Sequence, residues 1–237
     1  MQSYRPPIAI LCLVLAIAFA VSPFLVQDFS GFDPNQFPIP QDDPPVQPAG
    51  YAFAIWGVIY GWLILGLAWG LFKARHDGQW HDMRRPLCLS LAVGTVWLSV
   101  AVASPIWASV LIWVMLLSAL AALFVAPVAD QTWAAWPVGL YAGWLSAASC
   151  VSLGLLAAGY GWTDETTAAL IFVGLAIVIA GFVQGALGRA PTYGIAVIWA
   201  LVAVVVQNYE TTPMIAYVAG GGALVLLVPT LRAFRAM

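Results

Sequence analysis

Two histidines and two aspartates share one short segment and are the first candidates for chemistry. The segment RHDGQWHD places His76 and His81 five residues apart, next to Asp77 and Asp82, and the chain has no other histidine. Such a group could hold a metal ion or a haem. Its position between two apolar runs is more typical of a solvated loop, which is the interpretation we favour.

No other set of residues has the spacing of a known catalytic or metal site. Cys12, Cys88 and Cys150 lie far apart in the chain and predict neither a disulfide framework nor a metal site. We find no Ser-His-Asp arrangement, no phosphate-binding glycine loop and no basic patch for nucleic acid. We therefore expect no catalytic residues, no metal, no nucleic-acid partner and no enzymatic activity.

Aromatic rings are the second source of chemistry, because 12 of the 237 residues are tryptophan. The flat face of an indole can stack on a planar ligand, and a buried indole N–H needs an acceptor. For any single tryptophan, packing or lipid contact is the better interpretation. As a set in the second, third and fifth apolar runs, they predict an aromatic pocket. The tryptophans within the apolar runs are Trp56, Trp62, Trp69, Trp97, Trp113, Trp144 and Trp199.

The composition is that of a protein that crosses a membrane several times. Hydrophobic residues make up 63% of the chain and charged residues 8%, against roughly 25% charged in a soluble domain. A bilayer core needs about 20 helical residues, and the run from 87 to 126 is split at Pro105. We predict an all-α membrane bundle of eight spans: 7–26, 49–72, 87–104, 106–126, 137–158, 167–187, 192–207 and 213–231.

The cations give this map an orientation, because all eight Lys and Arg residues fall in alternate gaps between the spans. Cytoplasmic loops retain Lys and Arg, so both termini are expected in the cytoplasm, across what we expect to be a bacterial inner membrane. The first span also resembles a secretory signal with a cleavage site at Ala18-Phe19-Ala20. We expect this span to be retained; its removal would leave seven.

The long loop at 27–48 is expected on the outer side, with six prolines and no Lys or Arg. Phe29, Phe32 and Phe37 predict that it packs back on an apolar surface as a lid, the alternative being a tolerated surface loop. The predicted spans contain no Asp, Glu, Lys, Arg or His, which argues against a proton-driven pump. Hydroxyls such as Ser90, Ser146 and Ser152 should join helices instead.

Small residues recur four apart, a spacing that lets helices approach closely in a membrane. The pairs are Gly57 and Gly61, Gly66 and Gly70, Gly139 and Gly143, and Gly181 and Gly185. They predict a tightly packed bundle and nothing more specific. Trp80, Trp107, Trp133, Trp136 and Trp162 lie at predicted span ends and are expected to form an aromatic belt.

The stretch PAGYAFAIWGVIY, residues 48–60, resembles the signature of the tryptophan-rich sensory protein family, also called the translocator protein (TspO/MBR) family. There, the loop after the first helix enters the second through Pro-Pro-x-Trp-x-Phe, Pro-Val-Trp and Leu-Tyr elements. Here the spacing before the second Trp is one residue shorter, and the proline before it is missing. The matching positions are Pro48, Tyr51 in place of the first Trp, Phe53, Trp56 and Tyr60.

Two further elements resemble the same family. GTVWLS, residues 94–99, is similar to its Leu-Asn-x-x-Trp-Ser, with Trp97 as the Trp and Gly94 where the Asn stands. Tyr141 and Trp144 are similar to its Pro-Tyr-Leu-x-Trp, and Ser152 replaces a second Asn. The resemblance covers residues 7–158. It implies a five-helix unit at 1–158, to which 159–237 adds three helices in a longer, eight-helix branch.

The resemblance implies a bundle that binds porphyrins, sterol-like molecules or other hydrophobic ligands beneath the first loop, with a link to tetrapyrrole handling and stress or light signalling. No cofactor is certain, and a porphyrin- or haem-like molecule or a lipid is the ligand implied. The bilayer and a hydrophobic small molecule are the expected partners, with a homodimer or a larger membrane complex both open. The implied ligand-facing residues are Tyr51, Phe53, Trp56, Tyr60, Trp97, Tyr141 and Trp144.

Three functions remain open on these residues. The first is a receptor or carrier for a hydrophobic planar ligand. The second is a structural or assembly subunit of a larger, pigment-containing membrane complex, which the small-residue faces suit equally well. The third is a transporter without ion coupling. The lack of an internal repeat in the sequence argues against this third function.

Overall fold

Apolar helices make up nearly all of the chain in the computed structural model, which describes residues 6–26 and 31–235. Within those ranges there are eight α-helices and no strand, so the expected all-α membrane bundle is confirmed. Short 3-10 helices lie on either side of the long loop at Ser22–Phe24 and Gly50–Ala54, and a third lies within it at Pro34–Gln36. The α-helices are α1 Pro6–Val21, α2 Ile55–Lys73, α3 Gly78–Ala103, α4 Pro105–Phe124, α5 Ala135–Gly159, α6 Glu165–Leu187, α7 Thr192–Asn208 and α8 Pro213–Arg235.

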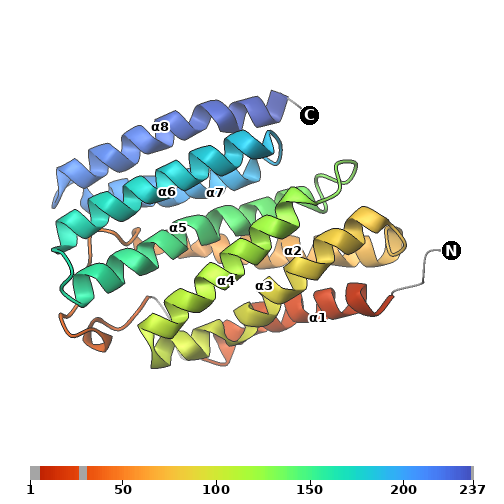
Figure 1. Cartoon of the computed structure of the whole chain (residues 1–237), viewed down its shortest axis with the longest axis horizontal. Helices are drawn as coiled ribbons and strands as arrows, with labels where there is room; N and C mark the ends of the chain where they lie inside the picture. The colour runs from red at the N-terminus through yellow and green to blue at the C-terminus, as the bar shows by residue number, and fades with distance from the viewer. Residues whose placement is uncertain (1–5, 27–30, 236–237) are drawn as a thin grey trace.

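Each predicted span corresponds to one helix. Seven helices are long and apolar enough to cross a membrane, and the eighth, α7, is apolar but shorter, with 17 residues. The beginning of α1 and the end of α8 lie toward the same end of the bundle, as an even number of crossings requires (Figure 1). Which end faces the cytoplasm stays a prediction.

Helix α3 begins earlier than the sequence predicted, at Gly78 instead of residue 87. The Asp77 carboxylate caps it by accepting a hydrogen bond from the Trp80 backbone N–H at 3.0 Å, and Pro86 lies inside the helix. The assignment of residues 73–85 to a loop was therefore wrong for the part from Gly78 onward. His81 lies on the helix, and no group of three metal-ligating side chains occurs in the described part of the chain.

One cation of that segment is buried instead of solvated. The Arg84 guanidinium lies 5.0 Å from the centre of the Trp80 ring and donates to the Ala74 carbonyl at 3.5 Å. Trp80 is itself fully buried, and its indole N–H donates to Asp130 at 2.8 Å, so its expected place in a solvent-facing belt was wrong. The cation–π contact and the Ala74 carbonyl stabilise this charge, while Nε and Nη2 of Arg84 are buried without a hydrogen-bond partner among the described residues.

Helix α5 is the centre of the molecule and is buried along most of its length. It packs against α2 and α4 on one side and against α6 and α7 on the other. The remaining contacts keep α1 to α4 together and α6 to α8 together, which agrees with the two layers on either side of α5 in Figure 1. A helix with neighbours on both sides must have small residues wherever backbones approach closely.

Two of the four predicted glycine pairs make such approaches. A Cβ on Gly143 would lie 2.2 Å from the Tyr193 carbonyl oxygen of α7, and one on Gly139 would lie 2.7 Å from Thr192 Oγ1. On α2, a Cβ on Gly70 would lie 2.2 Å from the Trp80 ring. Its partner Gly66 meets the backbone just before α5 in the same way.

Hydroxyl pairs join α5 to its neighbours, as expected for serines at membrane depth. Ser90 of α3 and Tyr141 of α5 share a hydrogen bond of 2.9 Å. Ser146 of α5 and Tyr193 of α7 share another of 2.9 Å. Ser109 of α4 bonds Ser152 of α5. The predicted interhelical role of these serines is confirmed.

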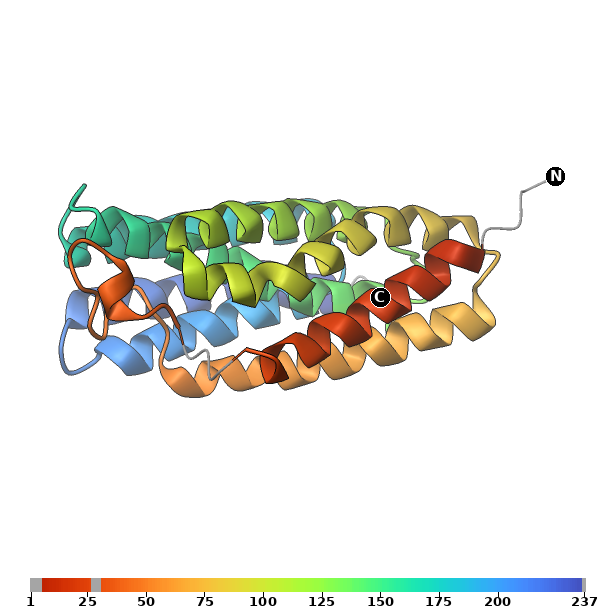
Figure 2. The same cartoon turned by 90° about the horizontal axis from the view of Figure 1, so that it is seen from below.

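The loop at 31–48 lies across one end of the bundle, at the left in Figure 2. Phe37 is buried against Gly159 at the end of α5, which confirms that the loop packs on an apolar surface. Phe29 lies outside the described residues. Hydrogen bonds tie the loop and its exit to four helices: Gln36 to the carbonyls of Ala101 and Val102, Ile39 N to Gly159 O, Gln41 to Glu165, Asn208 to Pro45 O, and Ala49 N to Ala203 O.

Replacing Gly143 by alanine should loosen the contact between α5 and α7. The added methyl group meets a backbone oxygen that cannot rotate away, so we expect a loss of about 1–3 kcal/mol in unfolding free energy. Gly61→Ala is the matched control, because Gly61 is exposed on α2 and a Cβ there meets nothing within 4 Å. Denaturant unfolding in micelles measures both; equal stabilities would contradict the packing described.

Candidate functional site

A large cavity lies among the first five helices. Its volume is about 380 Å³, and its walls come from α1 to α5 together with the flanking 3-10 segments. Aromatic side chains dominate the lining. They are Phe19, Phe24, Phe53, Trp56, Tyr60, Trp97 and Trp144.

The entry into α2 places one continuous aromatic face toward this cavity. Phe53, Trp56, Gly57 and Tyr60 all line it, at the i, i+3, i+4 and i+7 spacing that shares one side of a helix. The Trp56 and Tyr60 rings stack with centroids 5.2 Å apart and planes 20° apart. The family-like motif of this segment therefore corresponds to a physical wall.

Helix α5 supplies the adjoining wall. The Trp144 ring meets Trp56 edge-on at 6.2 Å and Phe53 edge-on at 5.9 Å. Trp97 of α3 is held by a hydrogen bond of 2.9 Å from its indole N–H to the Ala108 carbonyl of α4. These mutually perpendicular rings fix one another, so the cavity has flat faces of defined orientation.

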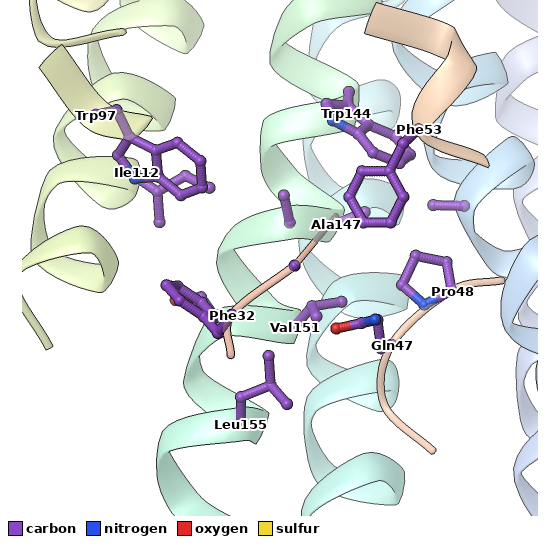
Figure 3. Close-up of a pocket in the computed structure, with 14 residues that line it drawn as sticks. Phe32, Gln47, Pro48, Phe53, Trp97, Ile112, Trp144, Ala147, Val151 and Leu155 are labelled. Carbon is purple, nitrogen blue, oxygen red and sulfur yellow. The ribbon is translucent and has the colours of Figure 1, made fainter. Parts of the chain in front are cut away.

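A smaller cavity of about 70 Å³ adjoins the first beneath the loop. It shares Phe53, Trp97 and Trp144 with the larger cavity, and Phe32 and Pro48 of the loop segment close it. Figure 3 shows Phe53 and Trp144 side by side, with Phe32, Gln47 and Pro48 on the loop side of the space. The loop thus forms part of the wall.

Five of the seven implied ligand-facing residues line the large cavity: Phe53, Trp56, Tyr60, Trp97 and Trp144. Tyr141 stands behind this layer, fully buried, with its hydroxyl on Ser90 and its ring 6.4 Å from Trp56. Tyr51 lies apart, 45% exposed, with its ring edge-on to Trp199 of α7 at 5.5 Å. The structure therefore does not place Tyr51 or Tyr141 on the cavity surface.

Phe19 of α1 is the main residue that sequence reasoning missed. It is buried and meets Trp56, Tyr60 and Tyr141 edge-on, with centroids 5.0 to 6.0 Å away. Helix α4 adds Ile112 and Met115. The pocket predicted on the second, third and fifth helices thus has walls on all five.

The position of the Phe19 ring also explains why residue 94 is a glycine. A Cβ on Gly94 would lie 2.9 Å from the Phe19 ring, so the ring occupies the space that a side chain at this position would need. The family pattern has an Asn at this position. In this chain the Phe19 ring fills the space that a side chain at position 94 would take.

The electrostatics of the site are simple, because no charged side chain is among the described residues that line either cavity. The polar lining groups are Tyr60 in the large cavity and Gln47 and Ser152 in the small one. Ser152 already has a partner in Ser109. Such a lining can bury and stack an apolar ligand.

Comparison with known protein families decides the class of this molecule. The profile of TSPO-like proteins matches residues 8–232. The chain belongs to the TSPO-like protein family. The match runs from α1 into α8 and so extends beyond the region that the motifs covered. Searches of the curated proteins and of the solved structures gave no significant match.

Family and helices together make this TSPO-like protein an integral membrane protein in contact with bilayer lipid. The exposed surfaces agree, since the outward faces of the helices consist largely of Val, Leu, Ile and Phe. The division into a unit at 1–158 and three further helices at 159–237 stays a prediction.

Truncating Phe19 should destabilise the wall of the cavity. We expect Phe19→Ala to lower the unfolding free energy by about 3 kcal/mol, because the ring loses its edge contacts and leaves a hole. Phe24→Ala is the control from the next turn: Phe24 is 86% exposed, and its loss should change stability by less than about 0.5 kcal/mol. Thermal unfolding in one detergent compares the two, and equal effects would argue against the packing role of Phe19.

Proposed function

We propose that this TSPO-like protein is a receptor or carrier that holds a hydrophobic planar or rigid ligand, porphyrin- or sterol-like, in the cavity among α1 to α5. The observation that carries the proposal is the cavity itself, about 380 Å³ in volume, walled by five helices and lined largely by aromatic rings. This volume lies within the roughly 300–1,000 Å³ typical of small-molecule sites.

The ring geometry favours a flat ligand. Trp56 and Tyr60 present stacked faces on one wall, and Trp144 stands nearly perpendicular to them on the other, at 83° to Trp56. A planar ring system could stack on one set while its edge meets the other, and both arrangements are favourable for aromatic pairs. The Tyr60 hydroxyl is the polar group available in this wall to orient the ligand.

The remaining parts of the proposal follow from the topology. We propose that the loop at 31–48 is a lid on the outer side, that both termini face the cytoplasm, and that the membrane is a bacterial inner membrane. The role is proposed to lie in tetrapyrrole or stress- and light-linked regulation, without an enzymatic step. Dimer formation and membership of a larger complex are both compatible with this role.

Titration with protoporphyrin tests the proposal. The protein in liposomes should show saturable quenching of tryptophan fluorescence and a saturable shift in the porphyrin absorbance. Trp144→Ala should weaken binding about tenfold, since losing one aromatic contact is worth roughly 1.4 kcal/mol. The absorbance serves as the readout for the variant, because the substitution itself removes a fluorophore.

Trp162→Ala is the matched control, because Trp162 is 73% exposed in the turn after α5 and does not line the cavity. Its affinity should equal that of the unsubstituted protein. Binding that is equally weakened in both variants, or in neither, would contradict a site between α2 and α5.

The uncharged lining also predicts a preference within the porphyrins. Burying a carboxylate without a partner is costly, and no described residue of the cavity wall carries a positive charge. The dimethyl ester of protoporphyrin should therefore bind at least as tightly as the free diacid once both affinities are corrected for partition into the same liposomes. A markedly higher affinity for the free diacid would show that a positively charged side chain reaches the ligand.

A further inference from the structure

Two glycines of α2 differ in a way that concerns the cavity. Gly57 and Gly61 lie one turn apart, both are exposed, and a Cβ on either would meet nothing within 4 Å. Gly57 lines the large cavity, whereas Gly61 does not. At Gly57, therefore, the same residue borders the inside of the cavity and the outside of the bundle.

The end of α1 forms the other side of the cavity wall near Gly57. Ala20, Pro23 and Phe24 line the cavity there, and Phe24 is also among the most exposed apolar residues of the chain. Helices α1 and α2 pack against each other. The cavity thus reaches the surface between the end of α1 and the beginning of α2.

The surface around this gap is apolar. Val58, next to Gly57 in α2, and Leu25, just after the end of the first candidate span, are both exposed. Gly57 lies seven residues after Gly50, the first residue of a 24-residue candidate span, or on the order of 10 Å along the helix. A position that far inside an apolar span faces acyl chains instead of water.

The route from the helix ends leads past the loop by contrast. Phe32 and Pro48 of the loop line the small cavity there, and the loop is fixed by the hydrogen bonds of Gln36 to α3 and of Ile39 to the end of α5. A ligand arriving from water on that side would have to pass loop residues that these hydrogen bonds hold in place. At Gly57 there is no side chain to move.

We infer that the ligand enters and leaves from the bilayer, through the gap between α1 and α2, and that the missing side chain of Gly57 keeps this gap open. The inference rests on the proposed function and narrows it to molecules that dissolve in the membrane. Gly57 determines how fast a ligand enters and leaves the site, and the neighbouring rings of Trp56 and Tyr60 contribute to how tightly it binds.

A lipid-soluble photolabel tests the route without any assumption about the ligand. A small aryl diazirine is added to the full-length protein in liposomes, and a flash within seconds converts it to a carbene that inserts into nearby C–H bonds. Mass spectrometry then compares labelling of residues 144–148 with labelling of Phe182, which is exposed on α6. Trp144 and Leu145 are almost fully buried, so label reaches this segment through the cavity.

The unsubstituted protein and Gly61→Leu should show labelling of residues 144–148. Gly57→Leu should reduce it about tenfold relative to Phe182, because a leucine side chain there would project into the open space beside Gly57 and obstruct it. Equal labelling in Gly57→Leu and Gly61→Leu, or no labelling of this segment in the unsubstituted protein, would overturn the inference. Thermal unfolding of each variant shows whether the bundle is intact.

Binding kinetics separate this inference from the proposed function. In stopped-flow measurements with protoporphyrin in liposomes, Gly57→Leu should slow association and dissociation by about tenfold while Gly61→Leu leaves both unchanged. If Gly57→Leu binds porphyrin with unaltered rates, entry through the gap is contradicted and the receptor role is not. If the protein does not bind porphyrin but its labelling depends on Gly57, the porphyrin site is contradicted and entry through the gap is supported.

Discussion

Close approach of helix backbones along α5 is the constraint on which the rest of this structure depends. Within a bilayer the lipid is as apolar as the side chains, so helices associate through tight packing and hydrogen bonds instead of through expulsion of water. Gly139 and Gly143 let α7 lie directly on α5, and the Ser90–Tyr141 and Ser146–Tyr193 pairs connect α5 to helices on opposite sides. A central helix held in this way provides a rigid wall for the cavity beside it.

The cavity arises because α2 packs closely at one end and not at the other. Toward the end of α2, Gly70 receives the Trp80 ring and Gly66 the backbone ahead of α5, so no space remains. Toward its beginning the same helix carries Trp56 and Tyr60, whose rings keep the neighbouring backbones at a distance. The close contacts at Gly66 and Gly70 and the cavity-lining rings of Trp56 and Tyr60 therefore lie at opposite ends of one helix, at the dense and the hollow parts of the bundle.

Much of this fold could be predicted from the sequence, because apolar runs, prolines at their ends and alternating cations are local signals. The beginning of α3 could not, since HDMRRP has the composition of a loop and Asp77 was the only sign of a helix start. At the site, the family resemblance implied that Phe53, Trp56 and Tyr60 face a ligand, and the structure places all three on the cavity wall. Phe19 could not be assigned to it, because nothing in one sequence says which helix lies beside which.

The lining of the cavity determines what kind of selectivity the protein can have. Both the bilayer and the cavity are apolar, so a ligand that moves between them gains little from leaving lipid, and the free energy must come from contact with the rings. The Phe19 ring packs against Gly94, the position where the family pattern has an Asn. The ring changes the shape of the space there without adding charge. The chain does bury a cation, Arg84, but at the dense end, where the Trp80 ring and the Ala74 carbonyl receive it. Selection at the hollow end consequently depends on the fit of a rigid outline between fixed aromatic faces.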